Sequence, residues 1–166
     1  MEWADFNLRQ DFISGHQPSA NPERSFHIVI SDDELLSIDN GEPWRPLDQD
    51  EWRWLGLTAV AEHCLGEVGG IPVFATEVEP GSDEPEGYSF RTLWSFLGRT
   101  EQSAFYLLGR ARQIVEWHNN HQFCGQCGQP THSTDFDRSR QCAPCKQMFY
   151  PRLSPSIIVL VTRGEE

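Results

Sequence analysis

Four cysteines in two pairs constrain this chain of 166 residues more than any other feature. Cys124 and Cys127 form the first pair, Cys142 and Cys145 form the second, and 14 residues separate the pairs. Two residues between cysteines let one tight turn point both sulfur atoms at the same ion, and zinc accepts four tetrahedral thiolates. The segment between the pairs suits a hairpin that returns the second pair to the first. The spacing therefore predicts a zinc ribbon with all four cysteines as metal ligands.

We expect this zinc ion to be structural, because four thiolates leave no coordination position open for a substrate. An iron site of the rubredoxin type, two disulfides or free core cysteines would account for the same residues. Thioredoxin-like redox chemistry is disfavoured, because it needs one such pair at the junction of a strand and a helix. The fifth cysteine, Cys64, lies in an apolar segment and is expected to be a buried structural thiol.

Charge is distributed unevenly along the chain, whose net charge is −12. Residues 1–100 hold 6 basic and 19 acidic residues (net −13), whereas residues 101–166 hold 7 and 6 (net +1). An acidic first half repels the phosphates of nucleic acids and acidic membranes, so we expect no DNA partner. No apolar run approaches the length of about 18 residues that spans a bilayer, and the first residues do not resemble a signal peptide. We therefore expect no membrane partner and a cytoplasmic location.

The first ninety residues predict a β-rich domain. Residues 25–30 and 34–38 are short β-prone runs. Residues 59–68 and 71–78 flank two glycines and predict a hairpin, because glycine takes positive φ angles without steric cost. The polar residues 1–24 are expected to form an arm with little structure.

After the charged loop 79–87, which is a candidate subdomain boundary, the sequence period becomes helical. Residues 91–97 predict a short helix, and Thr100 is placed to cap a longer one that reaches His118. Beyond the ribbon, the apolar residues 157–161 predict a buried strand. The longer helix has seven residues at helical spacing that we expect to be buried: Ala104, Leu107, Leu108, Ala111, Ile114, Val115 and His118.

Both flanks of the cysteine pairs carry a recognisable pattern. It comprises Leu108-Gly109-Arg110-Ala111, Trp117-His118, His121-Gln122-Phe123-Cys124-Gly125-Gln126-Cys127-Gly128 and Phe149-Tyr150-Pro151-Arg152-Leu153-Ser154-Pro155-Ser156-Ile157-Ile158. This pattern resembles the NADH pyrophosphatase family of Nudix hydrolases, in which the last segment leads from the ribbon into the first strand of the catalytic domain. The resemblance extends over roughly residues 91–161, and the first 90 residues share only the general layout.

The resemblance implies an α+β fold. A β-rich N-terminal domain with one or two helices would be followed by the four-cysteine zinc ribbon and the first strand of a truncated Nudix domain. The corresponding divisions are residues 1–90 for the β-rich domain, 91–120 for a helical segment that packs on it, 121–153 for the ribbon and 154–166 for that strand.

The resemblance also implies an enzyme that hydrolyses NADH or NAD to nicotinamide mononucleotide and AMP, and in some members removes NAD caps from RNA. It implies a homodimer as well. Catalysis in this family belongs to the Nudix box, whose glutamates hold Mg²⁺ or Mn²⁺ beside the pyrophosphate. That motif does not occur in these 166 residues. We therefore expect no catalytic residue in this chain, and we expect the catalytic Mg²⁺ or Mn²⁺ to bind in a missing domain. The chain would then be the front part of a longer enzyme and would be inactive by itself.

Three residues match positions at which the family binds substrate. Tyr150 is an aromatic ring that can stack on a nucleobase or nicotinamide, or else pack between domains. Arg91 carries a guanidinium that can clamp phosphate oxygens, or else is an exposed charge at a helix start. Asp137 matches an acidic position that contacts substrate in some members, and its alternative role is a solvated hairpin tip.

A stand-alone zinc-ribbon module that binds protein or RNA is the alternative function. Ribbons occur in nucleic-acid binders, enzymes and scaffolds, so the ribbon alone does not decide among them. The segment from Arg110 to Arg152 has six basic and three acidic residues, a net charge of +3, which leaves room for RNA contacts. Steeply salt-dependent RNA binding by this chain would favour the module.

Overall fold

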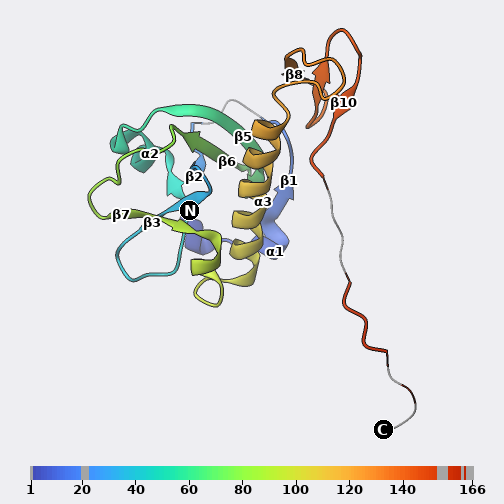
Figure 1. Cartoon of the computed structure of the whole chain (residues 1–166). Coiled ribbons are helices and arrows are strands. Elements are labelled where there is room, and N and C mark those ends of the chain that lie inside the picture. The colour runs from blue at the N-terminus through green and yellow to red at the C-terminus, as the bar shows by residue number, and fades with distance from the viewer. Residues whose placement is uncertain (1, 20–22, 153–156, 162, 164–166) are drawn as a thin grey trace.

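The β-prone runs of the first ninety residues pair into one mixed sheet in the computed structural model, which describes residues 2–19, 23–152, 157–161 and 163 (Figure 1). The strand order is β1-β5-β6-β2-β3-β7, and β4 pairs with β2 beside this path. Only β2 and β6 run parallel; the other pairs in this sheet are antiparallel. The strands are β1 (Phe12–Ser14), β2 (Phe26–Ser31), β3 (Glu34–Ile38), β4 (Leu47–Asp48), β5 (Ala59–Val68), β6 (Ile71–Val78) and β7 (Tyr88–Thr92).

The predicted hairpin is confirmed as β5 and β6, which turn through Gly69 and Gly70 with φ angles of 56° and 77°. The short runs at 25–30 and 34–38 are confirmed as β2 and β3. The loop 79–87 joins β6 to β7 within the same sheet, so it does not separate two subdomains.

The N-terminal arm is more ordered than its polar composition predicts. Among its described residues lie the 3₁₀ helix η1 (Trp3–Asp5), the helix α1 (Leu8–Asp11) and strand β1, which pairs with β5. Trp3, Phe6 and Phe12 pack against the main core, and Leu8 is buried in it. The prediction of a loose arm was wrong because burial of these few side chains offsets the cost of ordering the backbone.

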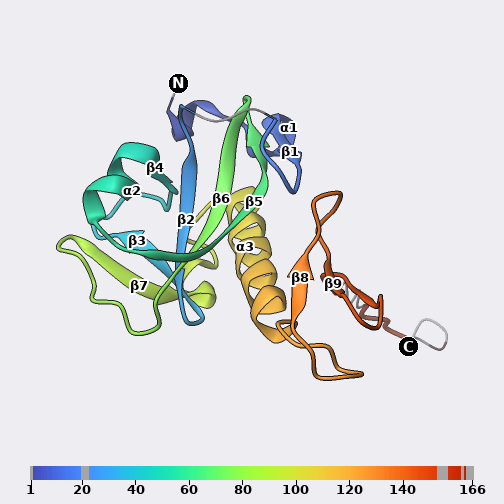
Figure 2. The same ribbon diagram turned by 90° about the horizontal axis from the view of Figure 1, so that it is seen from above.

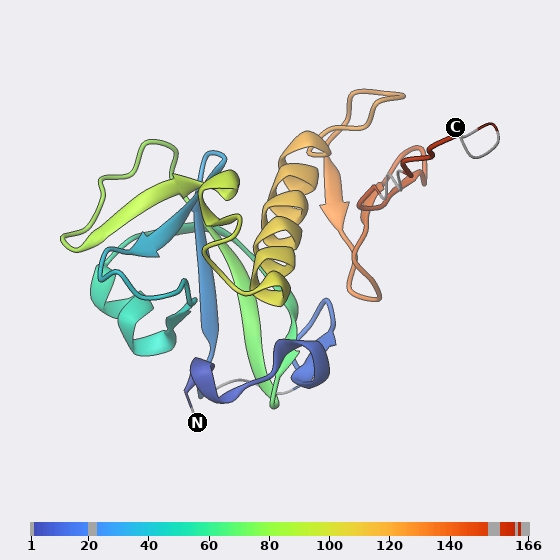
Figure 3. The same cartoon turned by 90° about the horizontal axis from the view of Figure 1, so that it is seen from below.

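Helices cover both faces of the sheet (Figure 3). Successive residues of β2 point to opposite faces, so that Ile28 and Ile30 join one core cluster and Val29 joins the other. The helix α2 (Gln49–Leu55) packs on the Val29 face, and α3 (Gln102–Asn120) packs on the opposite face. A capping box begins α2: the Asp48 side chain accepts from backbone amides, and the Glu51 side chain accepts from the Asp48 amide.

The long helix is confirmed as α3, with two corrections. Glu101 is the N-cap residue instead of Thr100, and no side chain caps the helix there. Six of the seven residues expected to be buried are buried. The exception is His118, which is half-buried, and its neighbour Trp117 is buried instead. The short helix expected at 91–97 is the end of β7 followed by the 3₁₀ helix η2 (Leu93–Phe96).

The segment after α3 forms a separate three-stranded antiparallel sheet of order β10-β9-β8. Its strands are β8 (Thr131–Ser133), β9 (Arg140–Cys142) and β10 (Met148–Phe149). The expected α+β class and the four-cysteine ribbon are therefore confirmed.

The strand expected after the ribbon is not formed in residues 157–161, the part of that segment that the structure describes. Residues 157–161 carry no strand, and their side chains are 67–103% exposed. No strand of the described sheets pairs with them, and a strand needs such a partner for its backbone hydrogen bonds. The remainder of the division 154–166 lies mostly outside the described residues. Across all the described residues of the chain, no helix has both the length and the apolar character needed to cross a membrane.

Candidate metal centre and its junction with the sheet

The two cysteine pairs sit in turns with the same backbone hydrogen bonds. In each turn the amide of the first cysteine donates to the carbonyl five residues later, and the amide four residues later donates back to the carbonyl of that cysteine. These bonds are Cys124 to Gln129 (2.8 Å), Gly128 to Cys124 (2.8 Å), Cys142 to Gln147 (3.0 Å) and Lys146 to Cys142 (2.8 Å). The matching turns explain why both pairs present their sulfur atoms in the same way.

The fourth residue after the first cysteine is left-handed in both turns. Gly128 has a φ of 72° and Lys146 has a φ of 58°. Only glycine adopts this conformation without steric cost, so the second turn is strained where the first is not.

Replacing Lys146 by Gly should therefore stabilise the zinc-loaded ribbon by about 0.5–1 kcal/mol, because the relief of left-handed strain exceeds the added flexibility of the unfolded chain. Urea unfolding of the zinc-loaded protein, followed by a signal from the ribbon, measures this change. The matched control is Gly128→Ala in the other turn, which should lower the unfolding midpoint. A lower midpoint for Lys146→Gly would show that its side chain contributes more than the strain costs.

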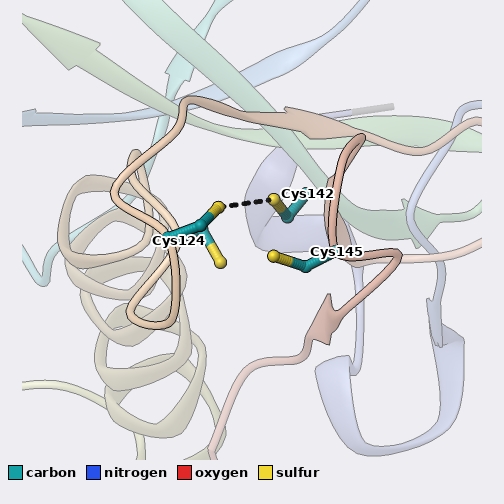
Figure 4. Close-up of side chains that lie close together, drawn as sticks. Cys124, Cys142 and Cys145 are labelled. Atoms are coloured by element: carbon teal, nitrogen blue, oxygen red, sulfur yellow. Dashed lines mark hydrogen bonds between the residues drawn. The ribbon is translucent and has the colours of Figure 1, made fainter.

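The four sulfur atoms converge on one point (Figure 4). All lie within 4.8 Å of one another, and the Sγ atoms of Cys127 and Cys142 are 3.5 Å apart. A zinc ion about 2.3 Å from each of four tetrahedral sulfurs would set them about 3.8 Å apart, so the arrangement fits that ion. All five cysteines are free thiols, which excludes the two-disulfide alternative.

The proximity of the four sulfurs also changes the acidity of the thiols. The pKa of Cys124 is lowered to about 7, mainly because the backbone amides of Cys127 and Gln126 donate to its sulfur. The pKa of Cys145 is raised to about 12, first by the facing sulfur of Cys127 and then by burial and the remaining sulfurs. Without a cation the Cys145 thiol therefore keeps its proton at neutral pH, and a zinc ion that binds all four sulfurs as thiolates would displace that proton.

A buried arginine joins the ribbon to the C-terminal end of α3. Arg140 is only 5% exposed, and burial lowers its pKa. Its guanidinium donates to the carbonyls of His121 (3.1 Å) and Thr131 (2.8 Å) and to Gln122 Oε1 (3.1 Å), and it contacts His118 Nδ1 at 3.0 Å. A cation at this end of a helix also interacts favourably with its exposed carbonyls.

A second arginine binds the ribbon hairpin to the edge of the sheet. Arg138 donates to the carbonyl of Gly15, just after β1, and to the carbonyl of Cys64 in β5 at 2.5 Å. Gln17 adds a bond of 2.8 Å to the carbonyl of Asp135. The ribbon is thus held against both α3 and the sheet. These two arginines could not be predicted as buried contacts from the sequence, because arginine side chains are mostly exposed in proteins.

Two of the three candidate substrate residues lie together on the ribbon. The Asp137 carboxylate accepts from the hydroxyls of Ser139 and Thr134, the latter at 3.0 Å. The Ser139 bond is the main cause of its lowered pKa, and Tyr150 contributes as a further hydrogen-bond partner. Tyr150 is 51% exposed, so part of the residue is accessible to a ligand.

Arg91 lies elsewhere. It belongs to β7, the edge strand opposite β1, and Figure 2 shows β7 and the ribbon on different sides of the molecule. The Arg91 guanidinium pairs with Asp39 at 2.8 Å and lowers the pKa of that carboxyl. Both residues line a hollow of about 600 Å³ together with Trp44 and Arg99. The structure therefore brings Asp137 to Tyr150 but does not bring Arg91 to either of them.

Comparison with known families accounts for both parts of the chain. The model of the NADH pyrophosphatase-like rudimentary NUDIX domain matches residues 25–117, and the model of the NADH pyrophosphatase zinc ribbon domain matches residues 119–150. The first match alone extends over more than half of the 166 residues. The second begins as α3 ends and includes all four clustered cysteines.

Curated relatives agree with the family models. The chain is 44% identical over 110 residues to the NAD-capped RNA hydrolase NudC of Pseudomonas putida KT2440, which is 66% of this chain and 40% of that protein. It is 39% identical over 140 residues to the enzyme of the same name from Pseudomonas fluorescens Pf0-1, 84% of this chain and 49% of the relative. The chain thus spans less than half the length of these relatives. It belongs to the NADH pyrophosphatase-like NUDIX family and carries that family's zinc ribbon.

Proposed function

We propose that this chain is the N-terminal and zinc-ribbon part of an NAD(H) pyrophosphatase, which hydrolyses NADH or NAD to nicotinamide mononucleotide and AMP. NAD-capped RNA is a second substrate in this proposal, as the names of the relatives suggest. The observation that carries it is the match of both family models, in order, over residues 25–150. The chain alone is inactive in this proposal, because the Mg²⁺ or Mn²⁺ and the catalytic glutamates belong to the Nudix domain. The parent is a cytoplasmic homodimer.

The proposed substrate residues have distinct roles. Tyr150 stacks on a base or on nicotinamide, which its half-exposed ring supports. Asp137 accepts a hydrogen bond from a substrate hydroxyl or amide, because the Ser139 and Thr134 hydroxyls keep its carboxylate ionised and oriented. Arg91 contributes a phosphate contact in a separate subsite, the hollow that it lines with Arg99. The division into residues 1–90, 91–120, 121–153 and 154–166 remains part of the proposal.

The stand-alone RNA-binding module has less support than its basic composition suggested. Arg138 and Arg140 donate to carbonyls at the ribbon junction, and Arg112 pairs with Asp33 at 3.2 Å. These three side chains account for half of the basic residues from Arg110 to Arg152. Fewer cations are therefore available for RNA phosphates, and a steep salt dependence of RNA binding is not expected.

The test of the proposed function begins with the gene. Sequencing past the codon for Glu166 should reveal an open frame with a Nudix box, and its full product should release nicotinamide mononucleotide and AMP from NADH with Mg²⁺ or Mn²⁺. The 166-residue chain, assayed under the same conditions, should release neither product. A stop codon directly after Glu166 would contradict the enzyme proposal.

In that full product, Tyr150→Ala should lower kcat/KM for NADH by about 5–150-fold, since stacking of an aromatic side chain on a base contributes about 1–3 kcal/mol. Tyr150→Phe should retain most of the activity, because it keeps the ring. The matched control is Tyr106→Ala on α3, which removes another exposed tyrosine ring and should leave kcat/KM unchanged. Equal effects of the two alanine variants would rule out a substrate contact at Tyr150.

A further inference from the structure

A hollow of about 520 Å³ lies where three distant segments of the chain meet. Its walls come from the N-terminal arm, from the loop between β3 and β4, and from the start of α3. It neighbours the hollow that Arg91 lines, because Pro43 and Trp44 contribute to both. Neither the four cysteines of the ribbon nor the three candidate substrate residues line it. Its volume is within the range of about 300–1,000 Å³ that is usual for sites that bind small molecules.

Apolar side chains form a large part of the wall. They include Trp3, Phe6, Leu8, Trp44 and Ala104. The rings of Trp3 and Trp44 stand nearly perpendicular, at 83°, with their centroids 6.4 Å apart. The Trp44 indole donates to the carbonyl of Leu36 at 3.3 Å, and Trp3 packs edge-on against Phe26. Both indoles are therefore held in place by contacts within the chain.

The charged residues of the wall are mostly acidic. Glu2, Glu42 and Glu101 line the hollow, and all three are exposed. Among the residues that the structure describes, none of these carboxylates forms an ion pair. Arg45, the one basic residue of the wall, already pairs with Glu51 through two hydrogen bonds of 2.5 and 2.6 Å. The hollow thus combines an apolar lining with negative charge that no basic side chain compensates.

This combination selects the chemistry of the ligand. An anion would be repelled by the three carboxylates. A metal ion would pair with carboxylates but would gain nothing from the apolar lining. An organic cation with a methylene chain uses both features, because its ammonium groups pair with carboxylates while its methylene groups cover apolar surface and its charge is attracted to the aromatic rings. Three carboxylates favour a ligand with more than one ammonium group.

We propose that this hollow binds a linear polyamine. Its methylene chain lies against Trp3 and Trp44, and its ammonium groups pair with Glu42, Glu101 and Glu2. The excess of acidic residues in the first half of the chain favours the approach of such a ligand. The proposal goes beyond NAD(H) hydrolysis and does not depend on it.

The test is a titration of the zinc-loaded chain with spermidine, followed by the ¹H–¹⁵N signals of its six tryptophan indoles. Sodium chloride of matched ionic strength is the reference. The Trp3 signal, assigned as the one that is missing from Trp3→Phe, should shift saturably. The signal of Trp94, which is 71% exposed and does not line the hollow, should not shift. The absence of a saturable shift at Trp3 overturns the proposal.

A double variant tests the carboxylates. Glu42→Gln combined with Glu101→Gln should weaken spermidine binding by about 5–30-fold, as expected for the loss of two exposed ion pairs. Both residues are exposed, so the variant should remain folded. The matched control is Glu79→Gln combined with Glu116→Gln, which changes the net charge equally at exposed residues outside the hollow and should leave binding unchanged. Equal weakening by the two double variants would mean that spermidine responds only to the net charge of the chain, which overturns the proposal.

Two further probes separate a polyamine site from simpler sites. 1,8-Octanediol has about the length of spermidine but no charge, and it should bind at least about tenfold more weakly. Equal binding of the diol would identify an apolar site for neutral molecules and would overturn the proposal. Magnesium chloride at matched ionic strength should not shift the Trp3 signal. A saturable shift at the same midpoint as spermidine would identify a site for any polyvalent cation and would also overturn the proposal.

Discussion

Removing zinc with a chelator, or replacing Cys142 by Ser, should unfold the ribbon while the sheet and α3 stay folded. Among the residues that the structure describes, none after Val115 belongs to either hydrophobic core cluster. The ribbon strands are only two or three residues long, and their sheet buries few apolar side chains. Zinc binding contributes about 10–16 kcal/mol in small zinc-finger peptides, far more than this packing can supply. The domain core, in contrast, contains none of the metal ligands.

Hydrogen exchange measures this outcome region by region. In the zinc-loaded protein the amides of Cys124, Gly128, Cys142 and Lys146 should be protected, because each donates to a backbone carbonyl. Chelation should abolish their protection and leave that of β2 in place. The matched control is Cys64→Ala, which removes the one cysteine outside the cluster and should leave one zinc ion per chain. Continued protection of the ribbon amides without metal would show that the ribbon folds on its own contacts.

The features predicted correctly from the sequence are those with local signals. The cysteine spacing predicts the ribbon because each turn needs only a few adjacent residues. The α3 stripe and the β5–β6 hairpin follow from periodicity and from two adjacent glycines. The capping box at Asp48 and Glu51 was also a local signal, and the start of α2 could have been predicted from it.

The features that sequence reasoning missed depend on contacts between distant segments. The pairing of β1 with β5 joins Phe12 to Val68, and nothing in either segment specifies that partner. Residues 157–161 have the composition of a strand, yet a strand forms only where another strand accepts its hydrogen bonds. The family resemblance named Arg91, Asp137 and Tyr150 as one group of candidates, but an alignment carries no distances, and only two of them lie together.

The burial of Arg140 leads to the second large prediction. Arg140→Met should destabilise the docked, zinc-loaded ribbon by about 2–4 kcal/mol. Methionine fills much of the volume and avoids the cost of burying a charge, which alone would favour the variant. It also removes the guanidinium donor from the Thr131 carbonyl, the Gln122 side-chain oxygen and the His121 carbonyl, of which the last keeps the Thr131 hydroxyl as a donor. A buried acceptor left without any partner costs about 1–3 kcal/mol. We expect the loss of these bonds to dominate, because one guanidinium satisfies several acceptors at once.

Urea unfolding of the zinc-loaded protein, with the His118 ring signals as a reporter of docking, measures this loss. The stability of Arg140→Lys should lie between that of the parent chain and that of Arg140→Met, since an ammonium keeps the charge but lacks the planar fork of donors. The matched control is Arg53→Met, whose exposed guanidinium lies 3.8 Å from Asp50 and should contribute less than about 0.5 kcal/mol. If Arg140→Met were as stable as the parent chain, the zinc ion and Arg138 alone would suffice to dock the ribbon, and Arg140 would be a buried charge without net benefit to stability.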